Sequence, residues 1–217
     1  MSQLGTELEE LKEAMSEGSG EEALRKQKEL IARLRSLGVG KDALGTGAKV
    51  HDFTLPDQVG ADVRLSDLLK LGDLVVSFFR GAWCPFCETE LKALHMALPD
   101  IEARGARLIA ISPQIIEKSM TMAERLLLDY SVLSDQGNHV AKEFGLAFEI
   151  PEEFREFHDD MADLEAYNRD LSYLLPIPAT YVVDQTGTIR YAYVNVDYTE
   201  RAEPEEVLKA LDEIRGQ

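Results

Sequence analysis

The chain has few cysteines, two in 217 residues, and a single tryptophan. Two cysteines are too few for a disulfide-stapled secreted scaffold, which depends on several such pairs. Basic residues are also scarce, because 23 Lys and Arg stand against 40 Asp and Glu and leave a net charge of -17. Nucleic-acid phosphates and anionic lipids repel a surface of this sign, so neither kind of partner is expected. We interpret the acidity as a solubilising surface.

Long apolar runs are also missing. None approaches the roughly 20 residues that a membrane-spanning helix requires. The acidic start MSQLGTELEELKEAM has no apolar segment of the kind that a secretory signal carries. We therefore expect a cytoplasmic protein. Structural disulfides seldom persist in that compartment, so the cysteine pair is expected to have another role.

Both cysteines lie in one stretch, Leu74–Met96, which reads LVVSFFRGAWCPFCETELKALHM. The apolar run over residues 74–79 predicts a buried strand, and the leucine spacing after the cysteines predicts a helix. A Cys-x-x-Cys motif at such a junction is typical of thioredoxin-like redox proteins.

The local chemistry favours a redox role for this pair. Pro85 suits the first position of a helix, so Cys84 is expected at or beside the N-cap. Unpaired backbone N–H groups and the helix dipole favour a thiolate there, and the thiolate is the reactive form. Cys87 follows one turn later on the same face, at a separation compatible with a disulfide. Cys84 is therefore predicted to attack the substrate and Cys87 to close the disulfide.

Inert cysteines or half of a zinc site are the alternatives for this pair. Structural zinc needs four ligands, and the sequence has no second Cys/His pair at metal spacing. We therefore expect no metal and no cofactor. The four histidines are scattered, and each is predicted to be a surface or a satisfied core histidine: His51, His95, His139 and His158.

The predicted site environment includes Arg80, Trp83 and Pro85. Arg80 could stabilise the thiolate or be a solvated loop charge, and the sequence leaves both open. Trp83 is expected to shield the thiolate, with a partly buried anchor as the alternative. Gly81 is expected to serve backbone geometry.

The rest of the chain predicts an α/β fold with a central mixed β-sheet flanked by helices. Residues 1–46 form an N-terminal helical arm and linker, broken near Gly18–Gly20, which packs on its own domain or on a partner subunit. Residues 47–217 form the main domain, which begins with a β-hairpin. A helical insert at about 147–172 contains an amphipathic helix over Pro151–Asn168.

Five motifs in this order carry a family resemblance: Phe53–Asp57 (FTLPD), Arg80–Cys87 (RGAWCPFC), Ile109–Gln114 (IAISPQ), Val132–Asp135 (VLSD) and Pro178–Asp184 (PATYVVD). From about Gly47 to its end, the chain resembles peroxiredoxin-like proteins of the alkyl hydroperoxide reductase and thiol-specific antioxidant superfamily.

The resemblance implies a thioredoxin fold with an N-terminal β-hairpin, thiol-based reduction of peroxides or disulfides, and a homodimer. By position, Cys84 matches the peroxidatic cysteine and Cys87 the resolving cysteine of thioredoxins. Pro178 resembles the cis-proline that faces the Cys-x-x-Cys motif in that fold.

The chain also departs from the family pattern. Ser77 and Gly81 stand where a typical peroxiredoxin has a proline and a threonine or serine before its reactive cysteine. Ile177 and Pro178 stand where the family's second arginine should precede a strand. The usual peroxide pocket is therefore incomplete, which favours a thioredoxin-like dithiol.

The leading hypothesis is a cytoplasmic antioxidant oxidoreductase in which the Cys84 thiolate reduces hydrogen peroxide or a small alkyl hydroperoxide. Cys87 then condenses with the sulfenic acid, and an external thioredoxin- or glutathione-type thiol reduces the disulfide. A thiol-disulfide oxidoreductase acting on protein or small disulfides is the alternative. A non-catalytic interaction module that uses the arm and the insert is the second alternative.

Overall fold

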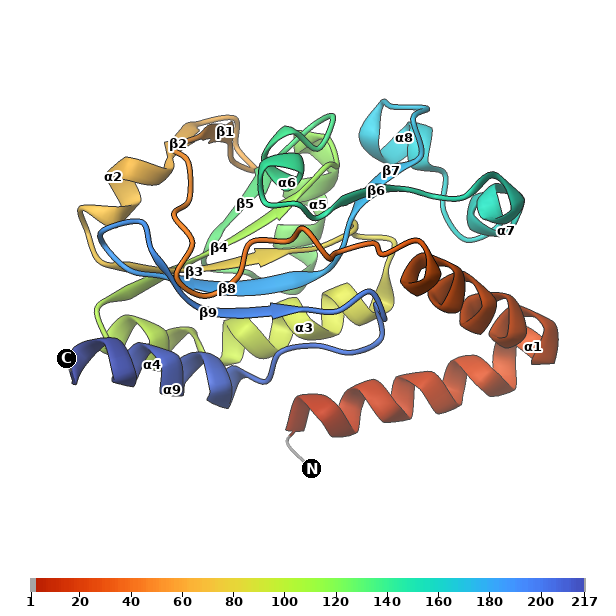
Figure 1. Ribbon diagram of the computed structural model, residues 1–217, viewed down its shortest axis with the longest axis horizontal. Helices are drawn as coiled ribbons and strands as arrows, with labels where there is room; N and C mark the ends of the chain where they lie inside the picture. The colour runs from red at the N-terminus through yellow and green to blue at the C-terminus, as the bar shows by residue number, and fades with distance from the viewer. Residues whose placement is uncertain (1–2, 217) are drawn as a thin grey trace.

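A five-stranded mixed sheet forms the centre of the computed structural model, which describes residues 3–216 (Figure 1). The strand order is β5-β4-β3-β8-β9. The strands are β3 (Asp73–Phe78), β4 (Ala106–Ser112), β5 (Ser131–Ser134), β8 (Ala179–Val183) and β9 (Ile189–Val194). The first three are parallel, and β8 runs antiparallel to both β3 and β9. The predicted mixed α/β sheet is confirmed.

The alternation of side chains along β3 divides the core into two layers. Val75 belongs to the hydrophobic cluster on one face of the sheet, whereas Leu74 and Val76 belong to the cluster on the other. Both faces are apolar because helices cover both, as is usual for parallel strands.

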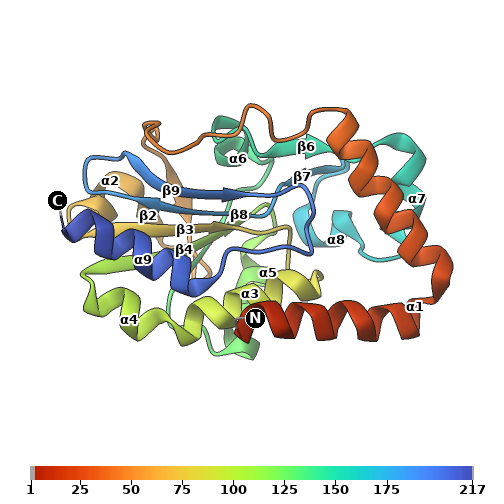
Figure 2. The same cartoon turned by 60° about the horizontal axis from the view of Figure 1, so that its bottom comes forward.

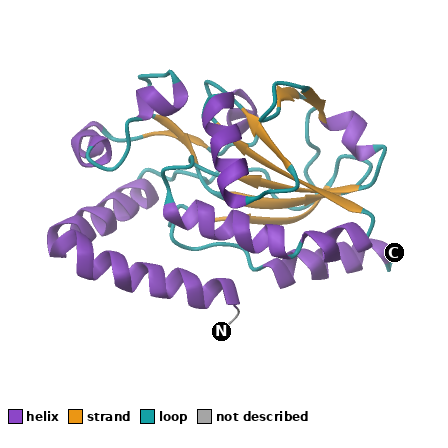
Figure 3. Ribbon diagram, turned by 180° about the vertical axis from the view of Figure 1, so that it is seen from behind, coloured by secondary structure: helices purple, strands orange, loops and turns teal. Residues whose placement is uncertain are grey.

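Helices cover the two faces unequally (Figures 2 and 3). The first face packs against α1 (Gln3–Ser36), α3 (Pro85–Met96), α4 (Leu98–Ala103), α5 (Ile116–Leu126) and α9 (Pro204–Arg215). The second packs against α2 (Leu65–Leu69), α6 (His139–Glu143) and the hairpin of β1 (Thr54–Pro56) and β2 (Asp62–Arg64). No helix within residues 3–216 is both long and apolar enough to cross a membrane.

The N-terminal arm bends once and packs on its own domain. Gly20, at φ 76° and ψ 159°, interrupts α1 in the segment where the sequence predicts a break. Leu8 before the bend and Leu34 after it are both buried in the same cluster as residues of α3. The sequence left open whether the arm packs on its own domain or on a partner subunit, and these contacts are with its own domain.

The predicted single helix over Pro151–Asn168 is wrong. The structure has three short helices there, η1 (Glu152–Phe154), α7 (Arg155–Asp159) and α8 (Leu164–Asn168). Asp163 leaves the helical conformation and its side chain accepts a hydrogen bond from Ala166 N, so a new helix starts there. The flanking segments pair as two short antiparallel strands that the sequence did not reveal, β6 (Ala147–Glu149) and β7 (Leu174–Pro176).

The expected cis-proline is absent. No cis peptide bond occurs within residues 3–216, so the Ile177–Pro178 bond is trans. The chain here passes directly from β7 into β8, and Ile177 N donates to Leu146 O at 2.9 Å. A trans bond keeps this connection extended, which is the conformation favoured before proline.

Candidate active site

Cys84 occupies the N-cap of α3, beyond the carboxyl end of the central strand β3. It has extended backbone angles, φ −96° and ψ 109°, and Pro85 follows in the first turn. Its carbonyl accepts hydrogen bonds from Cys87 N and Glu88 N, both at 3.1 Å. This is the N-cap position that the sequence predicts for Cys84, although its side chain makes no capping hydrogen bond to the backbone of α3.

Each cysteine sulfur has a guanidinium beside it. Arg80 Nη2 donates to Cys84 Sγ at 3.1 Å, and Arg201 Nη2 donates to Cys87 Sγ at 3.3 Å. The Cys87 thiol also donates to the Cys84 sulfur, so the two side chains face each other. Cys84 therefore receives hydrogen bonds from a cation and from its partner thiol.

These contacts separate the pKa values of the two thiols. Burial opposes ionisation of Cys84, but the Cys87 thiol and the Arg80 and Arg201 charges outweigh it and hold the pKa of Cys84 well below its usual range. The pKa of Cys87 is raised well above its usual range, mainly by burial. The hydrogen bond that Cys87 donates to the Cys84 thiolate and the negative charge of that thiolate raise it further. The pair therefore holds one thiolate and one thiol.

A buried ion pair extends the site along α3. Glu90 lies one turn beyond Cys87, and its carboxylate pairs with Arg201 Nε at 2.7 Å and accepts from Thr180 Oγ1 at 2.8 Å. The Glu90 and Arg201 side chains are both only 1% exposed. Burial raises the pKa of Glu90, and Arg201 acts against this rise.

The buried charges balance only if Cys84 is ionised. Arg80 and Arg201 bring two positive charges, and the Glu90 carboxylate neutralises one. An un-ionised Cys84 would leave a buried cation without a partner, which is costly in a protein interior. The Cys84 thiolate supplies the second negative charge.

Aromatic rings cover the Arg80 guanidinium, which lies beside the Cys84 sulfur. The guanidinium carbon lies 3.7 Å from the centroid of the Tyr198 ring and 4.6 Å from that of Trp83. Both cysteines are 0% exposed. The sulfurs face each other as expected, but a substrate reaches them only when part of this cover moves.

The helical insert contributes His158 to the cover, which contradicts its prediction as a surface or satisfied core residue. The imidazole meets Trp83 edge-on at 4.9 Å, is 1% exposed, and has no hydrogen-bond partner among the described residues at either nitrogen. Burial and the charge of Arg80 lower the pKa of His158 to about 3. The ring is therefore neutral and adds no further cation to the site.

The other predicted residues have different outcomes. Arg80 is 4% exposed, which excludes the solvated-charge alternative. Trp83 is half-buried over Arg80, which fits both a shield and a partly buried anchor, and Pro85 is exposed in the first turn of α3. Pro178 is buried beside the start of β8. Gly81 serves backbone geometry, because its φ is 153° and an added Cβ would lie 2.4 Å from Trp83 Nε1.

Sequence reasoning missed Glu90, Thr180, Tyr198 and Arg201. Arg201 and Tyr198 lie on the irregular segment between β9 and α9, where no periodic pattern or motif marks them. The helical spacing of Glu90 from Cys87 was the one available signal, since it places a carboxylate on the same face of α3. Arg201 also gives the site a second guanidinium, which the sequence lacks at its usual family position.

A mixed sheet of this topology, with a polarised cysteine pair where a helix follows its central strand, defines a thiol-dependent oxidoreductase of the thioredoxin fold. The AhpC/TSA family matches residues 46–192. The chloroplastic peroxiredoxin Q of Sedum lineare is 30% identical over 169 residues, which cover 78% of each chain. The chain belongs to the AhpC/TSA family.

Further similarities agree with this assignment. A Mycobacterium tuberculosis protein provisionally named a peroxiredoxin is 40% identical over 104 residues, which span 46% of this chain and 66% of that protein. The crystal structure of the peroxidoxin BcpB from the same species has a TM-score of 0.63 at 27% identity, covering 79% of this chain and 99% of that one. The PrxQ structure from Xylella fastidiosa has a TM-score of 0.63 at 17% identity, covering 79% and 98% of the two chains, and supports the fold alone.

The predicted thioredoxin-like fold and the predicted enzyme class, a peroxiredoxin-like thiol peroxidase, are thereby confirmed. The family match also has informative limits. It begins at residue 46, after α1, and ends at residue 192, before Tyr198 and Arg201. The arm and two residues of the site therefore lie outside the matched segment.

Proposed function

We propose that this chain reduces hydrogen peroxide or small alkyl hydroperoxides, with Cys84 as the nucleophile and Cys87 as the resolving thiol. The balance of buried charge carries the proposal. Two guanidiniums and one carboxylate surround the pair, and the Cys84 thiolate is the group that neutralises the remaining charge.

The first step follows from this charge distribution. The Cys84 thiolate attacks one peroxide oxygen, so that an S–O bond forms as the O–O bond breaks. The departing oxygen takes up a proton and leaves as water or an alcohol, and Cys84 becomes a sulfenic acid. Arg80 Nη2, at 3.1 Å from the sulfur, is placed to donate to oxygen as negative charge develops on it.

The second step is favoured by the loss of the Cys84 charge. The pKa of Cys87 is raised partly by the neighbouring thiolate, and that cause disappears when Cys84 is a neutral sulfenic acid. Arg201 stays beside Cys87 at 3.3 Å and favours its ionisation. Cys87 then attacks the Cys84 sulfur, an S–S bond forms, and the hydroxyl leaves as water. An external thioredoxin- or glutathione-type thiol reduces the disulfide by exchange.

Burial of the pair decides between small and large substrates. Cys84 is 0% exposed, and Trp83 and Tyr198 pack on the Arg80 guanidinium beside it, so a small peroxide needs a smaller opening than a protein disulfide does. The second candidate, a thiol-disulfide oxidoreductase, is tested by comparing turnover of peroxide with turnover of insulin or glutathione disulfide. A faster reaction with the disulfides would favour that candidate.

We also propose a cytoplasmic location and a homodimer. The two cysteines are free thiols, which suits a reducing compartment. Met96 and Leu127, 75% and 76% exposed, line one hollow near the start of α1, where a second copy could pack. Light scattering on the purified chain tests the dimer, and a monomer mass at micromolar concentration would contradict it.

The proposed division of the chain gives the additional segments a role. Residues 1–46 form an arm, residues 47–217 form the redox domain, and the insert at about 147–172 belongs to that domain. Arg33 Nε in the arm pairs with Glu153 in the insert at 3.1 Å, so these two segments contact each other. We propose that together they cover the cysteine pair.

Serine variants test the cycle. Cys84→Ser is expected to abolish peroxide turnover, because it removes the nucleophile. Cys87→Ser is expected to stop after one oxidation, with a sulfenic acid on Cys84 that dimedone traps and mass spectrometry locates. A Cys84→Ser variant that keeps full peroxide turnover would overturn the proposal, as would a wild-type chain whose two thiols stay free under mild peroxide.

A further inference from the structure

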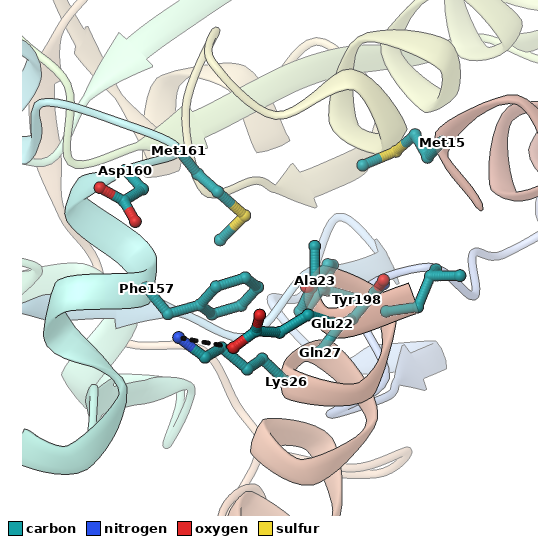
Figure 4. A pocket seen from close by; sticks show the side chains of 10 residues that line it. Met15, Glu22, Ala23, Lys26, Gln27, Phe157, Asp160, Met161 and Tyr198 are labelled. Atoms are coloured by element: carbon teal, nitrogen blue, oxygen red, sulfur yellow. Dashed lines mark ion pairs between the residues drawn. The ribbon is translucent and has the colours of Figure 1, made fainter. Parts of the chain in front are cut away.

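A cavity of about 420 Å³ lies where the arm bends, between α1 and α7 (Figure 4). Its apolar lining comes from Met15, Leu24, Phe157 and Met161, and Tyr198 forms part of its wall. We propose that this cavity binds the uncharged apolar tail of an organic hydroperoxide whose peroxide group reacts at Cys84. This inference rests on the peroxidase function proposed above.

Tyr198 connects the cavity to the redox site. Its ring lines the cavity and also lies 3.7 Å from the Arg80 guanidinium, which donates to Cys84 Sγ at 3.1 Å. One aromatic side chain therefore separates the cavity from the Arg80 guanidinium, which contacts Cys84. A peroxide group at the inner end of the cavity reaches Arg80 when the Tyr198 ring turns aside.

The insert forms a second connection. Phe157 lines the cavity, and its neighbour His158 packs against Trp83 over the site. Two consecutive residues of α7 thus contact the cavity and the cover. An occupant that displaces Phe157 would also disturb the contact between His158 and Trp83.

The lining selects the chemistry of the ligand. Thioether and aromatic side chains adapt to apolar groups of irregular shape. The volume lies within the roughly 300 to 1,000 Å³ that is usual for small-molecule sites. These properties fit an alkyl or aryl group and exceed what hydrogen peroxide needs.

The charges at the rim disfavour an anionic tail. Glu22 and Asp160 bring two carboxylates against one ammonium group, that of Lys26. Lys26 Nζ lies 4.0 Å from Glu22 Oε1 and 5.8 Å from the centroid of the Phe157 ring (Figure 4). Because the cation is shared in this way and the rim is negative overall, a neutral hydroperoxide is favoured over a fatty-acid hydroperoxide with its carboxylate.

The cavity is built largely outside the family match. The α1 residues precede the matched segment, 46–192, and Tyr198 follows it. The cavity therefore adds a substrate preference to the cysteine chemistry that the matched segment supplies.

The reaction is balanced with a hydroperoxide ROOH. The Cys84 thiolate takes the outer oxygen, the O–O bond breaks, and the alkoxide takes a proton and leaves as ROH. The sulfur is oxidised by two electrons and the peroxide is reduced by two. Cys87 and the external thiol then return the sulfur to its starting state with release of water.

A filling variant tests the site in the full-length protein. Ala23 lines the cavity after the bend, so Ala23→Phe places a ring inside it. We expect the ratio of kcat/KM for cumene hydroperoxide to that for hydrogen peroxide to fall about tenfold, as for the loss of a few apolar contacts. The matched control is Ala32→Phe, on the exposed side of the same helix, which is expected to leave the ratio unchanged.

A binding measurement keeps the test independent of the folding of Ala23→Phe. The product of cumene hydroperoxide, 2-phenyl-2-propanol, is titrated into the reduced wild-type chain and followed by the fluorescence of the single tryptophan, Trp83. We expect saturable binding that Ala23→Phe weakens. Peroxide turnover with no alcohol binding and an unchanged ratio would overturn the cavity assignment alone. Absence of turnover with every peroxide would instead overturn the proposed function.

Discussion

Replacing Arg201 with methionine is the sharpest test of the buried charge network. Arg201→Met keeps much of the apolar volume but removes the partner of Glu90, whose carboxylate is buried 2.7 Å from Arg201 Nε. At an effective dielectric constant of about 20, the lost attraction is about 6 kcal/mol before desolvation is counted. Breaking a buried pair from one side typically costs about 3–5 kcal/mol.

The proton limits this cost and makes it depend on pH. In Arg201→Met, Glu90 avoids a buried charge by binding a proton. Protonation of the carboxyl costs about 1.4 kcal/mol more for each unit by which the pH exceeds its ordinary pKa of 4.5. The penalty is therefore about 3.4 kcal/mol at pH 7 and about 0.7 kcal/mol at pH 5. The folded variant binds the extra proton, so its stability falls as the pH rises.

Urea unfolding at pH 5 and pH 7 measures the effect. Relative to wild type, the deficit of Arg201→Met should be about 2–3 kcal/mol smaller at pH 5. The double variant Arg201→Met/Glu90→Gln has no carboxyl to strand, so its deficit should depend less on pH than that of Arg201→Met. The dependence that remains comes from the pKa of Cys84, which the Arg201 charge lowers in wild type. His158 is present in every chain compared, so its titration cancels. An equal deficit of Arg201→Met at the two pH values would refute the reasoning.

Three further predictions follow from the site. Arg80→Met removes the hydrogen bond that a cation donates to Cys84, which is worth about 1.5–3 kcal/mol. The pKa of Cys84, measured from the pH profile of its alkylation, should therefore rise by about 1–2 units, whereas the exposed control Arg107→Met should leave it unchanged. The pKa of His158 is lowered from 6.5 to about 3, so the stability of wild type falls as the pH drops below 6.5. In urea unfolding, the free energy of unfolding of His158→Phe should therefore rise by about 2 kcal/mol relative to wild type when the pH is lowered from 7 to 5. Gly81→Ala should cost about 1–3 kcal/mol in urea unfolding and shift the fluorescence of Trp83, because the new methyl group meets the indole at a φ that favours glycine; an unshifted spectrum would contradict that contact.

The part of the site that lies on regular elements could be predicted from the sequence. An apolar run, Pro85 and a leucine period are local signals, and they were enough to place Cys84 at a helix N-cap with Cys87 a turn away. The N-cap position depends on residues that are adjacent in the sequence, so it can be predicted without knowledge of tertiary packing. The resemblance to the AhpC/TSA family rested on Arg80–Cys87 together with four further motifs elsewhere in the chain.

The part of the site that depends on tertiary packing could not be predicted from the sequence. Arg201 lies on an irregular segment, and only the fold brings its guanidinium to Cys87 and Glu90. His158 was assigned to an amphipathic helix, but the insert breaks at Asp163 and its first part turns the imidazole onto Trp83. The helical spacing of apolar residues predicts which side chains are buried, but it does not predict which residues they contact.

The same distinction explains the error at Pro178. The proline aligned by position with a residue that is cis in the resembling fold, yet here β7 pairs with β6 just before it and the chain enters β8 extended. The short strands β6 and β7 have three residues each and no alternating pattern long enough to detect.

The most direct measurement is the rate of the reaction of reduced protein with hydrogen peroxide as a function of pH. Stopped-flow fluorescence of Trp83, the single tryptophan beside Cys84, follows the oxidation. The account predicts a second-order rate that already has its full value at neutral pH, with a midpoint well below the roughly 8.5 of an ordinary thiol. A midpoint at or above that value, or a fluorescence change that persists in Cys84→Ser, would contradict it.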